Sequence, residues 1–276
     1  MVTKETSMSS DKVAAFGGTL AEFYDRYLVP LNFAPYAEVI AERVKQLRPR
    51  RVLETAAGSG IVTEALARTL PSDTTITATD FNQAMIDIGK ARPGMARVNW
   101  QQADAMKLPF GDSAFDLVLC QFGVMFFPDR PAAFAEARRV LAPGGHLVFN
   151  TWDALETHQF GAAVVDGLRH AFPADPPTFL ADIPHGYTDP ARITADLAAG
   201  GLVCDSLDTI TLSATAEAAD VALGFCTGTP IRAEIDARGD LASTTALVQS
   251  EVRSRLGDGP VTATMTAHVI VAHRPG

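Results

Sequence analysis

Cysteine is scarce in this 276-residue sequence, and its three cysteines, Cys120, Cys204 and Cys226, lie far apart. An odd number of cysteines at such spacing gives neither a disulfide framework nor a zinc ligand set, so a reducing compartment is the expected setting. His146 and His170 do not stand at metal-ligand spacing with acidic residues, and we predict no metal site.

Long apolar runs are also missing. The longest, Leu117 to Phe127, is interrupted by Gln121 and falls well short of the ~20 residues that a membrane helix needs. Residues 1–12 are polar, are expected to fray, and contain no apolar segment of the kind found in secretory signals. The sequence therefore predicts a cytoplasmic protein without membrane attachment.

Positively charged residues are fewer than negatively charged ones. The 23 Lys and Arg residues are outnumbered by 32 Asp and Glu residues, which gives a net charge of −9. This balance disfavours a phosphate-binding surface, so neither nucleic acid nor an anionic membrane is an expected partner. A hydrophobic content of 47% with 20% charged residues is typical of a globular chain. The sequence makes no prediction of oligomeric state.

Strand and helix patterns alternate between residues 51 and 152. Short apolar or β-branched runs predict strands, and segments with apolar residues at helical spacing separate them. This alternation favours a doubly wound α/β fold with a parallel sheet and right-handed crossovers. The expected strands are RRVLETA (50–56), TTITATD (74–80), RVNWQQAD (97–104), FDLVLCQF (115–122) and HLVFNTW (146–152), and the expected helices span 59–70, 82–92 (with Asn82 as N-cap) and 130–141.

The N-terminal part, residues 13–48, is rich in aromatic side chains, Phe16 among them. Pro30 and Pro35 preclude one straight helix over the whole segment. A helix is expected from Tyr36 to Leu47, where apolar residues recur at helical spacing. We interpret this part as a lid and a helix in front of a cofactor-binding core at 51–152.

The C-terminal part departs from the strand–helix rhythm. Residues 153–190 carry many prolines and residues 214–259 look helical, so both are interpreted as insertions that cap a substrate. Strands are expected at 203–212 and 262–274. We expect residues 1–276 to form a single domain.

The most informative stretch is VLETAAGSG, from Val52 to Gly60. A strand ends there in an acid, Glu54, and the chain turns through small residues into a helix. Glycine permits the backbone angles of a tight turn, and small side chains let a ligand approach the backbone. In open α/β sheets, ligands bind at the carboxyl ends of the strands, near the point where the strand order switches.

Two common ligands of such a turn fit poorly. A P-loop would have a lysine directly after its glycine, whereas Ile61 follows Gly60. A dinucleotide motif would place its third glycine at Thr63, and no Lys or Arg lies in the loop to meet a pyrophosphate.

Three acids at successive strand ends indicate a different ligand. Glu54 favours a cation over a phosphate. Asp80 ends the second strand, at the place where an acid reaches both ribose hydroxyls, and Asp104 follows the third strand, where it would accept from an adenine amino group. S-adenosylmethionine fits this set, because it joins a nucleoside to positive charge and has no phosphate.

The same residues resemble the motifs of class I methyltransferases that use S-adenosylmethionine. VLETAAGSG resembles their first motif, ATDFNQAMIDIGKAR the next, QQADAMKLPFGDSAFDLVLCQFGVMFF the two that follow, and RRVLAPGGHLVFNTW the segment after them. The set is similar to the family that includes quinone-biosynthesis methyltransferases and many bacterial small-molecule methyltransferases. The resemblance is specific over residues 20–152 and extends to the C-terminal third only in outline.

The resemblance implies roles for individual residues. The turn would line the methionine part of the cofactor, Phe81 would flank the adenine, and Gln121 would face the amino group. Ala56 departs from the family pattern, which has glycine there, and its methyl group is expected to narrow the methionine pocket. The expected cofactor-binding residues are Tyr24, Tyr27, Glu54, Ala56, Gly58, Ser59, Gly60, Asp80, Phe81, Met85, Asp104, Ala105 and Gln121.

The fold implied by the resemblance is a Rossmann-like, seven-stranded sheet of order 3-2-1-4-5-7-6 with the last strand antiparallel. This would account for the strand that closes the chain. In similar enzymes an N-terminal lid closes over the cofactor, so Tyr24 or Tyr27 is expected to reach its methionine end.

The implied reaction is in-line transfer of a methyl group to a small, partly hydrophobic molecule, with S-adenosylhomocysteine as product. Orientation and exclusion of water are the main requirements. A base is needed where the nucleophile carries a proton, and His158 and His185 in the 153–190 insertion are the candidate catalytic residues. The residues expected to roof an apolar acceptor pocket are Phe160, Phe172, Phe179, Leu180, Leu223 and Phe225.

Three alternatives stay open. One is an NAD(P)-dependent oxidoreductase on a Rossmann-like fold, which Thr63 in place of the third glycine disfavours. Another is a regulatory protein that binds S-adenosylmethionine without catalysis. The third is a methyltransferase that acts on a macromolecule, for which the acidic charge disfavours RNA.

Overall fold

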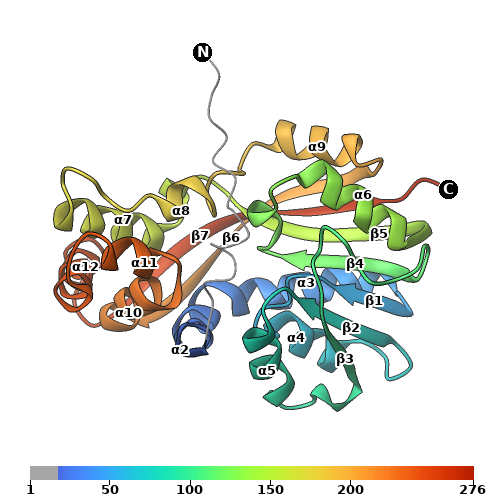
Figure 1. Cartoon of the computed structure of the whole chain (residues 1–276), viewed down its shortest axis with the longest axis horizontal. Helices are drawn as coiled ribbons and strands as arrows, with labels where there is room; N and C mark the ends of the chain where they lie inside the picture. Colours follow the sequence, from blue (N-terminus) through green and yellow to red (C-terminus); the bar gives the residue numbers. More distant parts are fainter. Residues whose placement is uncertain (1–17) are drawn as a thin grey trace.

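The computed structural model describes residues 18–276, and the expectations for residues 1–12 and for Phe16 lie outside the described residues. Seven strands form one sheet in the order β3-β2-β1-β4-β5-β7-β6 (Figure 1). This is the order that the resemblance implies, and the prediction is confirmed. The strands are β1 (Arg51–Glu54), β2 (Thr75–Asp80), β3 (Val98–Gln102), β4 (Phe115–Gln121), β5 (Leu141–Trp152), β6 (Val203–Glu217) and β7 (Pro260–His273).

The first five strands pair in parallel, and β7 pairs antiparallel with both β5 and β6. Strand β4 is buried along most of its length, as its nearly continuous apolar sequence predicts for a central strand. The order reverses between β1 and β4, which lie side by side at the centre of the sheet. The carboxyl ends of β1, β2 and β4 therefore converge on one edge.

Different helices cover the two faces of the sheet, because alternate strand residues point to opposite sides. Val52, Leu117 and Val148 belong to an apolar cluster with helices α3 and α4. Leu53 and Phe149 belong to the opposite cluster, with α6 and α9. The α-helices are α2 (Gly18–Phe23), α3 (Ala34–Leu47), α4 (Ile61–Thr69), α5 (Gln83–Ala91), α6 (Arg130–Val140), α7 (Gln159–Ala171), α8 (Phe179–Asp182), α9 (Pro190–Ala199), α10 (Ala218–Gly228), α11 (Ile231–Asp236) and α12 (Leu241–Leu256), with short 3₁₀ turns at Met95–Arg97, Val124–Phe126 and Leu155–Thr157.

The aromatic N-terminal segment is not one α-helix, as its two prolines predict. A π-helix, η1 (Tyr24–Phe33), joins α2 to α3 and contains Pro30. Pro35 stands in the first turn of α3, where a missing backbone N–H costs no hydrogen bond. Asn82 caps α5 as expected, because its side chain accepts a hydrogen bond from the N–H of Ala84.

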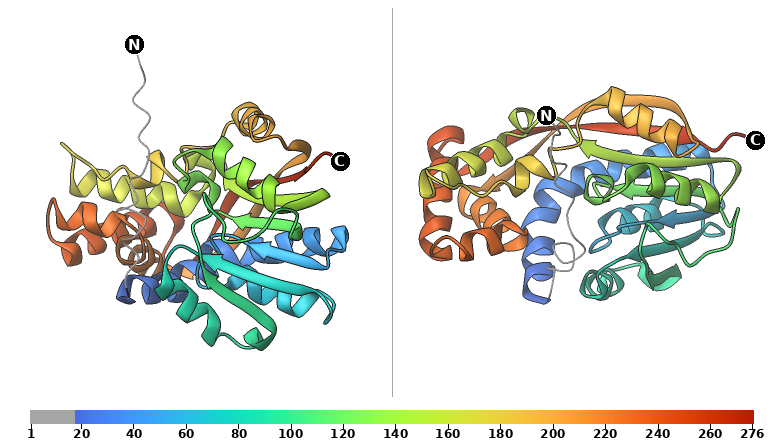
Figure 2. Two further views of the ribbon diagram at one scale, coloured as in Figure 1. Left: turned by 45° about the vertical axis from the view of Figure 1, so that its right-hand side comes forward. Right: turned by 45° about the horizontal axis from the view of Figure 1, so that its top comes forward.

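Strands β6 and β7 extend past the rest of the sheet. The helices α7, α10, α11 and α12 lie beside this extension, to one side of the core in both views of Figure 2, and we call them the cap. Strand β6 continues beyond its expected end at Leu212, and its last paired residue, Glu217, lies opposite Pro260. Helix α10 follows that strand directly and packs on η1, while α12 packs on α7. The cap is therefore attached to both the sheet and the N-terminal helices.

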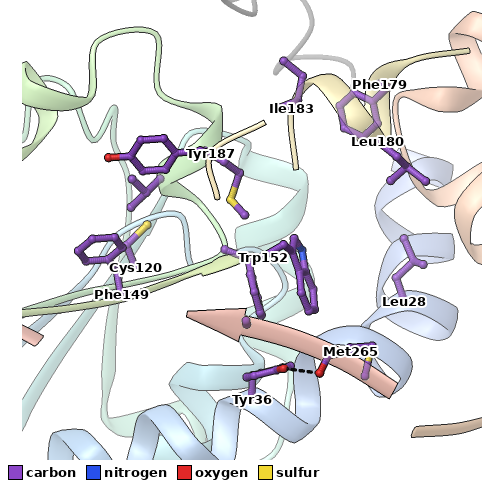
Figure 3. Packing of buried hydrophobic residues seen from close by; sticks show 14 of the residues in the cluster. Leu28, Tyr36, Cys120, Phe149, Trp152, Phe179, Leu180, Ile183, Tyr187 and Met265 are labelled. Atoms are coloured by element: carbon purple, nitrogen blue, oxygen red, sulfur yellow. Dashed lines mark hydrogen bonds between the residues drawn. The ribbon is translucent and has the colours of Figure 1, made fainter. Parts of the chain in front are cut away.

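One tyrosine anchors the region where the core, η1 and the cap meet (Figure 3). The hydroxyl of Tyr36, which is fully buried on α3, lies 2.8 Å from the carbonyl oxygen of Met265 and 2.9 Å from that of Ile210. Its ring contacts Trp152 and Phe122 edge to face, at centroid distances of 5.5 and 5.3 Å. These contacts fix the end of β5 against the β6–β7 ladder.

Two further observations bear on sequence expectations. All three cysteines carry free thiols, and Cys120 and Cys226 are buried. Within residues 18–276, no helix combines the length and the apolar composition that crossing a bilayer requires.

Candidate functional site

The turn after β1 is held in a tight, partly left-handed conformation. The N–H of Thr55 donates to Leu119 O of β4, and that of Ala57 donates to Thr79 O of β2, each at 2.9 Å. Ala56 has a φ of 51°, in the region that favours glycine. Its methyl group also restricts the neighbouring chain, because a Cβ added at Gly123 would lie 2.6 Å from the Cβ of Ala56.

The two glycines of the turn serve different purposes. A Cβ at Gly58 would meet only the ring of Tyr24, at 3.8 Å or more, and Gly58 lines the central cavity. A Cβ at Gly60 would lie 2.8 Å from the indole of Trp100 and 3.2 Å from the Cα of Gly89. Gly60 is therefore required by packing beneath the loop, and it does not line the cavity.

Glu54 ends β1 in a buried position, with 1% of its surface exposed. The hydroxyl of Thr63 donates to Glu54 Oε2 at 2.6 Å. Burial, reinforced by the nearby charge of Asp80 and opposed by the Thr63 hydrogen bond, raises the pKa of Glu54 to about 8. Thr63 thus occupies the position of a dinucleotide glycine but serves as a partner of the acid.

Asp80 ends β2 and braces the turn. Its Oδ2 accepts from the N–H of Gly58 and its Oδ1 from the N–H of Asn82, both at 2.8 Å. Burial raises the pKa of Asp80, while these backbone hydrogen bonds oppose the shift. Each carboxylate oxygen keeps acceptor capacity toward the cavity that Asp80 lines.

Beyond β2 and β3, four more of the expected residues line the same cavity: Phe81, Met85, Asp104 and Ala105. Phe81 leaves 42% of its surface exposed, which is unusual for a large apolar ring and suits a contact with a flat ligand. Asp104 accepts from the N–H of Met106 at 2.8 Å, so its carboxylate is held in place.

Tyr24 and Tyr27 lie on η1, and the structure brings only Tyr24 to the site. Tyr24 lines the cavity above Gly58, and burial raises the pKa of its hydroxyl. Tyr27 stacks on Phe23 with centroids 5.9 Å apart and does not line the cavity.

An ion-pair cluster holds η1 over the turn. The guanidinium of Arg92, at the end of α5, pairs with Asp25 of η1 and with Glu64 of α4. Its Nε also donates to the carbonyl oxygen of Ser59 in the turn at 2.5 Å. This arrangement ties the N-terminal helix to the loop that follows β1.

A cavity of about 290 Å³ lies between the strand ends and the cap. A small side cavity of about 20 Å³ shares residues with it, among them Tyr24, Gly58 and Gln121, and reaches Glu54 and Ser59. Two buried acceptors in this region, Gln121 Oε1 and Asn32 Oδ1, have no hydrogen-bond partner within the described part of the chain. Unpartnered acceptors beside buried acids fit a ligand that bears ammonium and hydroxyl donors, and S-adenosylmethionine is such a ligand.

The opposite wall of the cavity is aromatic. Phe122 follows β4 with a φ of 50°, a rare conformation for a bulky residue, and stacks on Trp152 at a centroid distance of 3.8 Å. Of the six apolar residues expected to roof a pocket, Phe179, Leu180 and Phe225 line it. The other three, Phe160, Phe172 and Leu223, do not line it.

Sequence reasoning missed Asn32, Phe122 and Trp152 as lining residues. The position of Trp152 at the end of the fifth strand carried a usable signal, because strand ends face ligands in such sheets. Nothing in the local sequence marks Asn32.

The two candidate bases both line the cavity beside Trp152. The ring of His158 lies edge-on to the indole at a centroid distance of 4.8 Å, and the ring of His185 lies at 6.1 Å. The two imidazoles lie nearly perpendicular to each other, with ring centroids 5.4 Å apart. Among residues 18–276, no group of His, Cys, Asp or Glu side chains has the arrangement of a metal site.

Comparison with known proteins shows the family of the chain. Residues 53–149 match the family described as a methyltransferase domain. The chain is 31% identical to the demethylmenaquinone methyltransferase of Deinococcus radiodurans over 164 residues, which is 55% of this chain and 68% of that protein. It is also 31% identical to a ubiquinone/menaquinone biosynthesis C-methyltransferase, UbiE, of Geotalea daltonii, over 50% of this chain and 62% of that protein.

Solved structures show the same fold at low identity. The cyclase SpnF aligns with a TM-score of 0.64 and 17% identity, over 98% of this chain and 97% of that one. A Haemonchus contortus N-methyltransferase in complex with S-adenosylhomocysteine and phosphomonomethylethanolamine aligns with a TM-score of 0.61 and 14% identity, over 96% of this chain and 60% of that one. The motif-bearing strand ends, the sheet order and the curated relatives agree, and the chain belongs to the class I S-adenosylmethionine-dependent methyltransferases.

Proposed function

We propose that this enzyme transfers a methyl group from S-adenosylmethionine to a small, largely apolar, ring-bearing acceptor. One observation carries the proposal: a single cavity joins the acidic strand ends to a wall of aromatic side chains. A methyl donor and an acceptor held in one enclosed site are oriented toward each other and shielded from water, which are the main requirements of such a transfer.

On the cofactor side, the residues of this chain bind and orient. Asp80 accepts hydrogen bonds from the ribose hydroxyls. Asp104 accepts from the adenine amino group, and Glu54 and Gln121 meet the positively charged amino-acid end. Bound S-adenosylmethionine supplies a methyl group that its sulfonium already makes electrophilic, so no residue has to activate it.

On the acceptor side, the wall is built from flat rings such as Phe122, Trp152 and Phe225. Aromatic rings favour stacked or edge contacts with another ring, so a flat apolar acceptor suits this wall. The relatives named for demethylmenaquinone and for ubiquinone or menaquinone biosynthesis support a quinone-like class of acceptor. The net charge of −9 disfavours nucleic acid as the acceptor. A cytoplasmic location stays a prediction from the sequence.

A nicotinamide dinucleotide is a poorer fit. Among the described residues, no Lys or Arg lines the cavity to meet a pyrophosphate. The buried carboxyl of Glu54 at the turn likewise offers no positive charge to a pyrophosphate.

Label transfer tests the proposal. The protein is incubated with methyl-labelled S-adenosylmethionine and a small-molecule extract, and the products are separated by size. We expect the label in a small apolar product that partitions into organic solvent. Label confined to protein or nucleic acid, or no transfer at all, would overturn the proposal.

A matched pair of variants serves as control. At a limiting concentration of S-adenosylmethionine, Asp80→Ala should strongly reduce labelling, because it removes an acid from the cofactor side. Asp73→Ala changes an exposed aspartate in the turn before β2 and should leave labelling unchanged.

A further inference from the structure

Two neighbouring histidines have opposite hydrogen-bond environments. His158 is 2% exposed, and both it and His185 line the cavity beside the aromatic wall. Each ring has one nitrogen engaged by the backbone, and the group that engages it differs. The backbone partner decides which nitrogen carries the proton in a neutral imidazole.

His158 caps helix α7. Its Nδ1 lies 2.8 Å from the N–H of Gly161, which can only donate, so Nδ1 is the unprotonated acceptor. The proton of the neutral ring is then on Nε2. Burial, together with the neighbouring His185, lowers the pKa of His158 to about 3, so the ring stays neutral at physiological pH. His158 therefore offers the cavity a donor.

His185 has the reverse arrangement. Its Nδ1 lies 2.7 Å from the carbonyl oxygen of Asp153, which can only accept, so Nδ1 carries the proton. The N–H of Asp153 donates to the carbonyl oxygen of Thr266 on β7, which holds the Asp153 backbone against the sheet. The free nitrogen, Nε2, has a lone pair, and burial lowers the pKa of the ring and keeps it neutral. His185 therefore offers the cavity an acceptor.

We infer that His158 and His185 bind one hydroxyl group of the acceptor between them, and that His185 removes its proton. The inference rests on the proposed function and narrows its substrate class to phenols or enols. A hydroxyl donates to one nitrogen and accepts from the other, whereas an ether or ketone oxygen satisfies only His158. The surrounding rings favour a hydroxyl attached to an aromatic or conjugated system.

The step balances without any further reagent. The hydroxyl proton moves to Nε2 of His185, and the O–H bonding pair stays on the oxygen, to which Nε2–H of His158 donates. That oxygen, or the ring carbon conjugated with it, forms the new bond to the methyl carbon. The methyl–sulfur bond breaks with its electron pair on sulfur. After transfer to oxygen, His185 releases its proton to water; after transfer to carbon, the ring carbon releases its proton to water and His185 returns its own proton to the oxygen.

Two variants separate these roles from structural ones. Asparagine reproduces the Nδ1 side of histidine: at 158 it accepts from the N–H of Gly161, and asparagine is a favoured N-cap. At 185 it donates to Asp153 O. His158→Asn and His185→Asn thus keep the backbone contact and delete Nε2, while His170→Asn changes an exposed histidine at the end of α7 as a control.

Binding of two probes tests the inference. Calorimetry in the presence of S-adenosylhomocysteine compares 2-naphthol with 2-methoxynaphthalene, which differs in lacking the O–H donor. We expect wild type and His170→Asn to bind 2-naphthol about tenfold more tightly than the ether. His185→Asn should remove this preference, and His158→Asn should weaken both ligands while keeping it.

Three outcomes would overturn this inference without contradicting the proposed function. They are equal binding of the two probes by wild type, binding of neither probe, and a preference for 2-naphthol that survives in His185→Asn. Long-range ¹H–¹⁵N correlation spectra add an independent readout, since they must show Nε2–H in His158 and Nδ1–H in His185. All variants should bind S-adenosylhomocysteine with wild-type affinity. Absence of S-adenosylhomocysteine binding by wild type would instead contradict the proposed function.

Discussion

The two halves of the central cavity are built in opposite ways. The proposed cofactor half comes from the ends of neighbouring strands, with Glu54, Asp80, Asp104 and Gln121, and the carboxylates of Asp80 and Asp104 accept from backbone N–H groups. The acceptor half comes from η1, the end of β5 and the cap, and its polar groups include two imidazoles held neutral by burial. The cofactor half is thus built from neighbouring strand ends, whereas the acceptor half is built from segments that lie far apart in the sequence.

This contrast predicts that substitutions in the two halves of the cavity have different effects. Changes in the acceptor half should affect turnover and leave cofactor affinity alone. Changes in the cofactor half should affect affinity for S-adenosylhomocysteine, in proportion to how closely the altered group approaches the ligand.

The largest effect is expected at His185. His185→Asn removes the proposed base and should lower turnover by about 10²–10⁴-fold, the usual contribution of such a group. The measurement uses the acceptor identified by label transfer, with S-adenosylhomocysteine affinity determined in parallel. A fall in affinity for S-adenosylhomocysteine together with turnover would contradict the prediction that the two halves act separately.

The next effect is expected at Gly58, which has a φ of 56° and borders the cavity. Gly58→Val adds a branched side chain where the cofactor approaches the backbone, and should weaken S-adenosylhomocysteine binding about 100-fold or more. Gly94→Val is the matched control, because Gly94 has a φ of 79° in a turn with no neighbour within 4 Å. Calorimetry should show the affinity loss in Gly58→Val only, although both variants bear backbone strain.

A smaller effect is expected for the acids. Hydrogen bonds to a charged acceptor contribute about 1.5–3 kcal/mol each, so Asp80→Ala should weaken S-adenosylhomocysteine binding at least about tenfold. Asp104→Ala should cost less, because a single donor is involved and ring contacts remain. A larger loss in Asp104→Ala would reverse the two roles.

The smallest effect is a pH dependence set by Glu54. Its pKa of about 8 means that at pH 7 the carboxyl is mostly protonated, and an ammonium ion bound beside it lowers that pKa and releases the proton. Affinity for S-adenosylhomocysteine should therefore rise about fivefold between pH 7 and pH 8. Calorimetry in buffers of different ionisation enthalpy measures the proton released.

The matched variant is Glu54→Gln, which cannot titrate. Its affinity for S-adenosylhomocysteine should be lower and show no such rise, and no proton should be released. An unchanged pH profile in Glu54→Gln would assign the dependence to another group.

The sequence predicted that Asp80, Phe81, Met85 and Asp104 lie together, because their signals are local. Glu54 and Asp80 stand at the ends of apolar strands, and the topology brings those ends together. Local signals did not separate Gly58 from Gly60, because the indole of Trp100 that makes Gly60 necessary comes from a different strand. They also did not show that Thr63 is the partner of Glu54.

The acceptor half was predicted only in part for the same reason. Phe179 and Phe225 were expected because they are aromatic residues in the insertions, but Phe160 and Phe172 carried the same signal and do not line the cavity. Asn32 reaches the cavity from a π-helix, and no spacing in the sequence predicts that helix type. Long-range packing of η1 against the cap decides which of these side chains reach the cavity.

The attachment of the cap determines how freely its helices can vary. Residues 218–259 leave the sheet after Glu217 and return at Pro260, and these two residues are paired across the β6–β7 ladder. Both ends of this insertion are therefore already fastened side by side, whatever lies between them. Helices of another length or sequence can fill this insertion without altering the register of β6 and β7. Such a change reshapes the part of the cavity wall that Phe225, Thr229 and Pro230 form, while the carboxylates at the far strands stay in place.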